Sequence, residues 1–272
     1  MSEEQSPDRV LRVPLHRAVL LAAGKGTRLG ELTENFPKPL LEVGGRPIIV
    51  HILDGLLSAG IDDVSIVTGH AGDILEREIG NGGASGLRIR YERQETPDGT
   101  ARALALAREH LSGDQFFFGW GDILVPSHDY RAVIRASRFA DATIAVNYVR
   151  DPFAGAAVYI EPPAGDAASG KPETQGGKVT RIVEKPPRGT STTHWNNAGF
   201  GVLGPSIWPK IHALQPSARG EYELPEAIAA LVEDGATVRA VPIEGQWFDI
   251  GTPEELETAR AAYSRGGARY DD

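Results

Sequence analysis

The sequence predicts an α/β protein with a Rossmann-like, mixed but mostly parallel sheet flanked by helices. Short apolar runs, typical of strands buried on both faces, alternate with segments of helical spacing. Over the first 125 residues this alternation follows the order βαβαβαβ, which implies parallel strands with helices on both faces of the sheet. The composition of the 272 residues, 41% hydrophobic and 24% charged, is that of an ordinary globular protein.

The elements of the first half follow from local patterns. We expect a first strand at residues 18–23, where an apolar run ends at Gly24. Residues 47–59 have the apolar spacing of a helix, with Pro47 in its first position and Gly60 just beyond its end. The other elements expected here are a strand at 63–68, a helix at 71–79, a strand at 87–91, a helix at 100–111 and a strand at 116–118.

The second half has a more mixed pattern. We expect a helix at 129–140, a strand at 142–149, a hairpin of 156–160 with 179–184, a strand at 200–203, helices at 206–213 and 224–233, a strand at 238–243 and a helix at 253–262. Residues 162–177 are rich in Pro, Gly, Ala and Ser, which predicts a mobile surface loop and a candidate lid. No linker divides the chain, so we expect a single domain at 17–265 between loose tails at 1–16 and 266–272.

Charge and composition exclude several classes of function. Lys plus Arg number 28 and Asp plus Glu number 37, so the net charge is −9. This argues against sequence-independent nucleic-acid binding and, at first sight, against a polyanionic substrate. The absence of cysteine excludes disulfides, thiolate metal sites and cysteine nucleophiles. Neither a signal peptide nor a membrane-spanning apolar stretch is evident, so we expect a cytoplasmic protein without a membrane partner.

A glycine-rich turn, residues 21–29, follows the first predicted strand. It fits neither the Walker A spacing nor the dinucleotide-binding fingerprint, because the required glycines are missing. Its backbone N–H groups could still approach phosphate oxygens, and Arg28 offers a bidentate donor, although a plain turn with a surface arginine has the same spacing. Further on, Pro37 and Pro39 stiffen the backbone around Lys38, which suits a phosphate contact but also an exposed turn.

Taken together, these segments resemble the sugar-1-phosphate nucleotidyltransferases, or nucleotide-sugar pyrophosphorylases. The resemblance rests on 21–28 with 37–41 and continues in order through Gln94 with 97–101, 121–122, 183–186, 197–200 and 247–253. It spans residues 17–262 and is closest in motif to short glucose-1-phosphate thymidylyl- and uridylyltransferases. The resemblance implies a nucleotide-binding lobe at 17–125 and a sugar-phosphate lobe at 126–265.

The resemblance also implies a reaction and its residues. A sugar-1-phosphate oxygen would attack the α-phosphate of a nucleoside triphosphate and release pyrophosphate. The catalytic residues implied are Arg28, Lys38, Asp122, Lys185 and Asp249. Asp122 and Asp249 would hold Mg²⁺, which prefers hard oxygen ligands, although spacing alone favours a turn or helix cap for each.

Two binding sets complete the implied site. The nucleotide-binding set is Leu21, Ala23, Gly24, Gly26, Thr27, Arg28, Gln94, Gly99 and Thr100. The sugar-phosphate set is Gly155, Glu184, Lys185 and Asn197. The partners implied are a nucleoside triphosphate and a sugar-1-phosphate, and a homo-oligomer is compatible with the family, whose members are often multimeric.

Several alternatives stay open. The segment 219–224 and the loop at 97–99 favour dTTP or UTP with glucose-1-phosphate. GTP with mannose-1-phosphate comes next, and Lys25 is shared with some CTP-dependent enzymes. A non-catalytic nucleotide-sugar sensor is disfavoured because the charged residues are all retained, and an oxidoreductase because the fingerprint glycine is missing. The sequence departs from the pattern at Ile123, where several members have Asn, and at Trp120.

Overall fold

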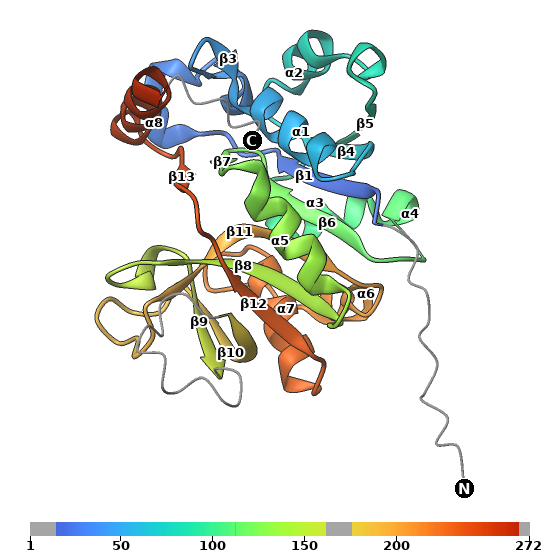
Figure 1. Ribbon diagram of the computed structural model, residues 1–272, viewed down its shortest axis with the longest axis vertical. Coiled ribbons are helices and arrows are strands. Elements are labelled where there is room, and N and C mark those ends of the chain that lie inside the picture. Colours follow the sequence, from blue (N-terminus) through green and yellow to red (C-terminus); the bar gives the residue numbers. More distant parts are fainter. Residues whose placement is uncertain (1–14, 112, 162–175, 267–272) are drawn as a thin grey trace, which may run out of the picture.

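A computed structural model describes residues 15–111, 113–161 and 176–266 of the chain. Its main strands are β1 (Arg17–Ala22), β4 (Asp63–Thr68), β5 (Arg88–Arg93), β6 (Phe116–Trp120), β8 (Ala142–Tyr148), β9 (Ala156–Glu161), β10 (Gly177–Glu184), β11 (Trp195–Leu203) and β12 (Val238–Pro242). They form one nine-stranded sheet in the order β5-β4-β1-β6-β11-β8-β12-β10-β9 (Figure 1). Because only β10 and β11 run opposite to the other strands, the sheet is mixed and mostly parallel, as predicted.

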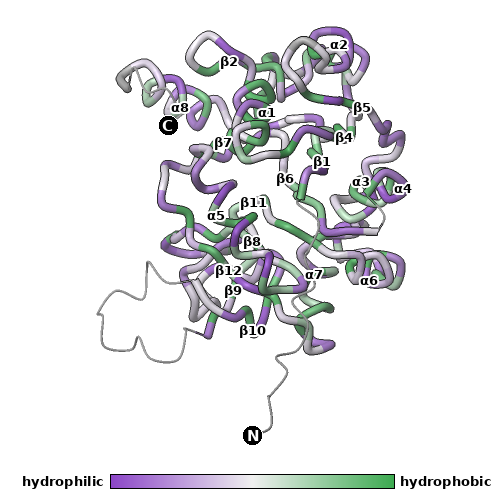
Figure 2. Tube along the Cα trace, turned by 45° about the vertical axis from the view of Figure 1, so that its right-hand side comes forward, coloured by the Kyte–Doolittle hydropathy of each residue, from purple (hydrophilic) through white to green (hydrophobic). Residues whose placement is uncertain are grey.

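The helices follow the predicted order along the chain. They are α1 (Ile48–Ser58), α2 (Gly72–Ile79), α3 (Thr100–Leu106), α4 (Arg108–Leu111), α5 (Ser127–Ser137), α6 (Ile207–Ala213), α7 (Leu224–Glu233) and α8 (Pro253–Gly266). Short 3-10 turns occur at η1 (Thr27–Leu32), η2 (Lys38–Leu40), η3 (Gly83–Ser85) and η4 (Pro152–Ala154). α2 and α8 alternate between hydrophilic and hydrophobic residues (Figure 2), as expected of helices with one face toward an apolar core and one toward water.

Many predicted ends are shifted by a few residues, and three of the differences have a local reason. The predicted helix at 100–111 is divided between α3 and α4, because the Ala107 amide donates to Leu104, three residues back, at 3.1 Å and tightens the turn. Pro47 is extended and precedes α1 rather than starting it. β11 begins five residues before Phe200, since its polar first half pairs with β8. The predicted loop at 162–177 lies largely outside the described residues, as do most of both predicted tails.

Successive residues of β1 belong to two different apolar cores. Ala18 and Leu20 pack in a core that includes residues of α1, α2 and α5, whereas Val19 and Leu21 pack in a core that includes residues of α3, α6 and α7. Successive side chains of a strand point to opposite faces, so each face of the sheet has its own core. Among the described residues, no helix combines the length and the apolar character required to span a membrane.

Two small strand pairs, which no periodicity indicated, complete the fold. β2 (Glu42–Val43) pairs with β3 (Arg46–Pro47), and β7 (Ile123–Leu124) pairs with β13 (Phe248–Asp249). β7 follows the carboxyl end of β6, and the glycine-rich turn follows the carboxyl end of β1 beside it. In open α/β sheets ligands bind at this edge. The fold therefore brings the C-terminal segment around Asp249 to the edge at which the first predicted motifs lie.

Candidate active site

A cavity of about 510 Å³ opens at the carboxyl edge of the sheet. The predicted site residues that line it are Arg28, Thr100, Asp122, Gly155, Glu184, Lys185, Asn197 and Asp249. The predicted residues that do not line it are Leu21, Ala23, Gly24, Gly26, Thr27, Lys38, Gln94 and Gly99. Lys38 reaches the site through an ion pair with Asp122, and Thr27 lines a second, adjoining cavity of about 280 Å³ with Lys25 and His70. Leu21 is buried in the core.

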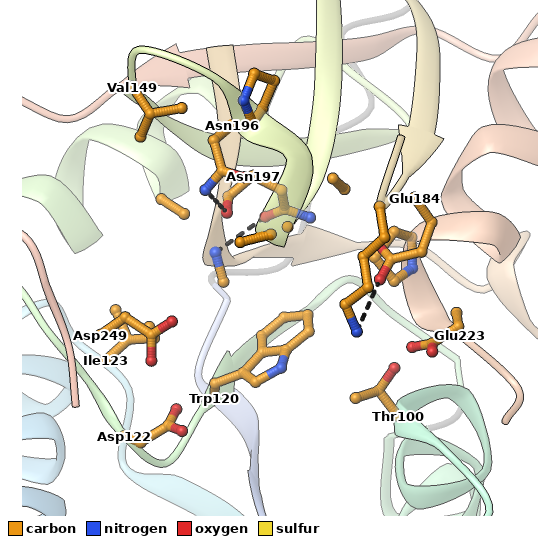
Figure 3. A pocket seen from close by; sticks show the side chains of 18 of the residues that line it. Thr100, Trp120, Asp122, Ile123, Val149, Glu184, Asn196, Asn197, Glu223 and Asp249 are labelled. Carbon is orange, nitrogen blue, oxygen red and sulfur yellow. Dashed lines mark hydrogen bonds and ion pairs between the residues drawn. The ribbon is translucent and has the colours of Figure 1, made fainter. Parts of the chain in front are cut away.

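Asp122 and Asp249 lie together at one end of the cavity (Figure 3). In the β7–β13 pair, Asp249 stands opposite Ile123, the residue after Asp122. The Ile250 amide also donates to the Asp122 carbonyl at 3.2 Å. A two-residue ladder thus brings together two carboxylates from distant parts of the chain.

Electrostatics distinguish these two carboxyl groups. Burial and then the neighbouring Asp122 raise the pKa of Asp249 to about 6, against the opposing effect of Lys38. One carboxylate oxygen of Asp122 accepts a hydrogen bond from the Lys38 ammonium. The other oxygen is buried and has no hydrogen-bond partner among the described residues. An unpaired buried carboxylate oxygen beside a second carboxylate fits a hard divalent cation.

Such a cation would need further ligands. In the described part of the chain, no cluster of three or more His, Asp or Glu side chains is arranged to hold a metal ion. A Mg²⁺ ion commonly uses one or two carboxylates, with water and substrate phosphate completing its shell. The residues present therefore fit a cation that binds together with a phosphate ligand.

Arg28 approaches the same end of the cavity from η1. A Cβ at Gly251 would lie 2.7 Å from Nη2 of Arg28 and 3.1 Å from Oε2 of Glu255, so both side chains approach this backbone closely. The Gly251 amide donates to Glu255 Oε2 at 2.8 Å. Glu255, which also lines the cavity, was not predicted from the sequence, because its spacing is that of an ordinary first-turn glutamate in α8.

The opposite end of the cavity holds Glu184 and Lys185 at the end of β10. Lys185 Nζ lies 3.5 Å from Glu184 Oε1, and the Lys185 amide donates to Gly155 at 2.8 Å. Lys185 has φ +41°, a left-handed conformation that costs an L-residue energy. A Cβ at Gly155 would lie 2.3 Å from Oδ1 of Asn196, so only glycine fits there.

Two asparagines of β11 form the wall beside this end. Asn196 Nδ2 donates to Asn147 at 3.0 Å, and Asn197 Oδ1 accepts the Gly199 amide at 2.9 Å. Asn197 Nδ2 is buried and has no hydrogen-bond partner among the described residues. A buried, unsatisfied amide donor that lines a cavity is suited to a polar ligand.

Arg219 forms ion pairs with Glu184 and with two glutamates of its own segment. Its Nη2 lies 3.8 Å from Glu184 Oε1 and 3.5 Å from Glu221 Oε2, and it also pairs with Glu223. Burial and then Glu184 raise the pKa of Glu223 to about 7, and burial raises the pKa of Glu184. The sequence predicted none of Arg219, Glu221 or Glu223 as site residues. The segment 219–224 had been linked to the choice of substrate by its resemblance, but the contact of Arg219 with Glu184 depends on the tertiary structure.

The predicted base-reading loop lies beside the cavity. Gln94 Nε2 donates to Asp98 Oδ1 at 3.0 Å and to the Gly99 carbonyl at 3.2 Å. Gly99 has φ +116°, and a Cβ there would lie 2.4 Å from the Tyr222 carbonyl oxygen. The Thr100 hydroxyl accepts the Leu224 amide at 2.9 Å at the start of α7. The loop is thereby attached to the segment that carries Arg219.

Fold and site define an α/β protein with a cavity at the carboxyl edge of its sheet, between a carboxylate pair and a group of cations. A family model described as nucleotidyl transferase matches residues 17–266. The chain belongs to this family and is a nucleotidyltransferase.

Individual relatives agree with this assignment. The UTP–glucose-1-phosphate uridylyltransferase AglF of Haloferax volcanii is 35% identical over 246 residues, which cover 89% of this chain and 94% of the relative. A glucose-1-phosphate thymidylyltransferase of Streptomyces antibioticus is 30% identical over 242 residues, covering 88% of this chain but 64% of the relative. The fold is that of a solved UDP-glucose pyrophosphorylase in complex with UDP-glucose, with a TM-score of 0.79 at 20% identity over 92% of this chain and 99% of that chain.

Proposed function

We propose that the protein transfers a nucleotidyl group from UTP or dTTP to glucose-1-phosphate and releases pyrophosphate and an NDP-sugar. The observation that carries the proposal is one cavity with a carboxylate pair and Arg28 at one end and Lys185 with Glu184 at the other, with Lys38 paired to Asp122 behind the first end. Both donor and acceptor are phosphates, so the protein must bring two anions into line and neutralise their charge. The uridylyl- and thymidylyltransferase relatives support the choice of substrates.

The reaction itself needs no side-chain nucleophile. A phosphate oxygen of the sugar-1-phosphate forms a bond to the α-phosphorus, and the bond from that phosphorus to the bridging oxygen breaks. Pyrophosphate leaves with the electron pair of that bond. The work of the protein is positioning and electrostatic stabilisation, as in other phosphoryl-transfer enzymes.

At the carboxylate end, Asp122 and Asp249 would hold Mg²⁺. The ion would supply charge neutralisation to the triphosphate. Arg28 would bind the phosphates that leave, since its planar fork matches two phosphate oxygens. Lys38, held beside Asp122, would lie near the reacting phosphate and stabilise the charge that develops there.

At the other end, Lys185 would bind the phosphate of the sugar and Glu184 would accept hydrogen bonds from its hydroxyls. Asn197, with its unsatisfied buried amide, would donate to another hydroxyl, and the backbone at Gly155 would close the pocket. Arg219 adds a second cation beside Lys185.

The nucleotide would lie along the first lobe, residues 17–125, and the sugar phosphate along the second, 126–265. The backbone of the glycine-rich turn would contact the phosphates, and its residues 24, 25, 27 and 28 are exposed for this purpose. Gln94, Gly99 and Thr100 would lie next to the nucleobase. The amide of Gln94 would form hydrogen bonds with the polar edge of the nucleobase.

The decisive experiment measures pyrophosphate release over a grid of five nucleoside triphosphates and several sugar-1-phosphates, with and without Mg²⁺. We expect turnover with UTP or dTTP and glucose-1-phosphate, dependent on the divalent ion. Asp122→Ala and Lys185→Ala should lower turnover by about 10²-fold or more. Asp141→Ala, which changes a carboxylate remote from the cavity, is the matched control. Preferred use of GTP with mannose-1-phosphate, or of CTP, would contradict the substrate choice, and no turnover with any pair would contradict the reaction.

A further inference from the structure

Trp120 occupies the middle of the cavity floor. It is the last residue of β6 and lies between Asp122 on one side and Glu184, Glu223 and Thr100 on the other (Figure 3). It is partly buried and packs against both apolar cores of the protein. The indole ring of Trp120 therefore lies at the carboxyl edge of the sheet, where it lines the cavity.

Neighbouring groups hold the ring in this place. Trp120 meets Phe118 edge to face, with ring centroids 5.7 Å apart and an interplanar angle of 62°. Gly199 has φ +87°, and a Cβ there would lie 3.5 Å from Cε3 of Trp120 and 3.1 Å from Cγ1 of Ile123. The left-handed φ and the close approach to Ile123 favour glycine at 199, and β11 passes in van der Waals range of the indole there. The ring is supported from the protein side and borders the cavity with the rest of its surface.

The chemistry of the walls contrasts with that of this floor. Glu184, Glu223 and Asn197 offer polar atoms, whereas Trp120 offers a flat apolar surface among them. A second indole, that of Trp247, also lines the cavity, and its Nε1 is bound to the Ala198 carbonyl at 3.0 Å. A ligand that suits this arrangement has polar groups around its edge and an apolar face. A pyranose ring has this form, with hydroxyls at its perimeter and C–H bonds on its faces.

We propose that Trp120 is the surface on which the pyranose ring of the sugar phosphate packs. The inference rests on the proposed function and adds a sugar-binding residue to it. Stacking on the nucleotide base is the competing role, since bases also pack on aromatic rings. Of the three residues proposed to contact the base, Gln94 and Gly99 do not line the cavity around Trp120 and only Thr100 does. Glu184, Lys185 and Asn197 of the proposed sugar-phosphate set all line it.

The test compares Trp120→Phe, Trp120→Ala and a control, Trp208→Phe. Trp208 is buried in the core, with its ring centroid 5.2 Å from that of Phe116, so the control changes a tryptophan remote from the cavity. We expect Trp120→Ala to raise the KM for the sugar phosphate about tenfold, the effect of losing one stacking contact. The KM for the nucleoside triphosphate should change less than about twofold, and Trp120→Phe, which keeps a ring, should lie between wild type and Trp120→Ala.

Equilibrium binding gives a second readout that does not depend on turnover. Calorimetric titration with UDP-glucose and with UTP should show that Trp120→Ala weakens UDP-glucose binding about tenfold and leaves UTP binding unchanged. Weakened UTP binding, or unchanged binding of both, would overturn the proposal. If Trp120→Ala does not fold, the affinities of Trp120→Phe for UDP-glucose and for UTP decide. Weaker binding of UDP-glucose with unchanged binding of UTP supports the proposal, and any other result contradicts it. If wild type binds UDP-glucose through Trp120 but shows no turnover with any pair, the proposed reaction fails while this inference stands.

Discussion

The Lys38 ammonium forms an ion pair with Asp122, 84 residues further along the chain. The pair joins the rigid Pro-Lys-Pro turn to the end of β6, and the two side chains are 10% and 23% exposed. The lysine therefore already neutralises one of the two carboxylates that we propose as metal ligands. Removing the lysine should therefore weaken catalysis while strengthening the binding of Mg²⁺.

Lys38→Met should lower turnover by about 10²-fold, because a cation beside the reacting phosphate is lost. The same change should lower the Mg²⁺ concentration for half-maximal activity, since the carboxylate pair becomes more negative. Steady-state assays across a Mg²⁺ series measure both quantities. Arg46→Met is the control, because its ion pair with Asp54 lies on the exposed surface, where such pairs contribute little. An unchanged turnover in Lys38→Met would contradict the assigned role.

The left-handed backbone of Lys185 predicts a separation of stability from activity. Lys185→Gly should be more stable than Lys185→Ala by about 1 kcal/mol, because glycine adopts φ +41° without a Cβ clash. Both variants lose the ammonium and should lose turnover to the same extent. Urea unfolding and pyrophosphate release measure the two effects. Equal stability of the glycine and alanine variants would show that the backbone at this position is unstrained.

Glu223 predicts a pH dependence of stability. Burial and Glu184 raise its pKa from 4.5 to about 7 in the folded protein. The folded state therefore binds this proton more tightly than the unfolded chain, so between about pH 4.5 and pH 7 rising pH lowers the free energy of unfolding. Glu223→Gln should weaken this fall. Urea unfolding from pH 5 to pH 8 measures it.

The control for this prediction comes from the same segment. Glu221 contacts the same Arg219 at 3.5 Å but its side chain is 42% exposed. Glu221→Gln removes an equal charge and, with it, the smallest of the contributions that raise the pKa of Glu223, so it should keep most of the wild-type pH dependence. The same slope in wild type and Glu223→Gln would mean that Glu223 is already ionised in the folded protein at pH 5.

Asp129 predicts a long-range effect on the proposed metal site. Its buried carboxylate accepts the Glu244 amide at 2.9 Å and the Gly245 amide at 3.3 Å, in the segment that leads to Asp249. Asp129→Asn replaces one acceptor oxygen with a donor and should loosen this turn. The Mg²⁺ requirement should then rise about tenfold, as for other residues that orient metal ligands.

Asp141 provides a matched control for this change, because it accepts the Thr237 amide at 2.8 Å at the other end of β12. Asp141→Asn should leave the Mg²⁺ requirement unchanged. Equal Mg²⁺ requirements for Asp129→Asn and wild type would mean that the β7–β13 pair alone positions Asp249.

Much of the fold could be predicted from local patterns. β4 and α7 begin and end at the predicted residues, and each predicted helix and strand is present with shifted ends or, for 100–111, as two helices. The spacing of apolar residues predicts these helices and strands because an element of five or more residues repeats its buried positions along the chain. The motif order also indicated the family and eight residues that line the cavity.

The tertiary structure decided how these parts meet. β7 and β13 have two residues each, too few for any period, yet their pairing brings Asp249 to Asp122. Arg219 bridges Glu184 and Glu223 only because the chain folds α7 beside β10. Trp120 differs from the expected pattern in the sequence, but its place on the cavity floor follows from the packing of both cores. Short ladders, side-chain networks and pocket surfaces join residues distant in sequence, so no local pattern specifies them.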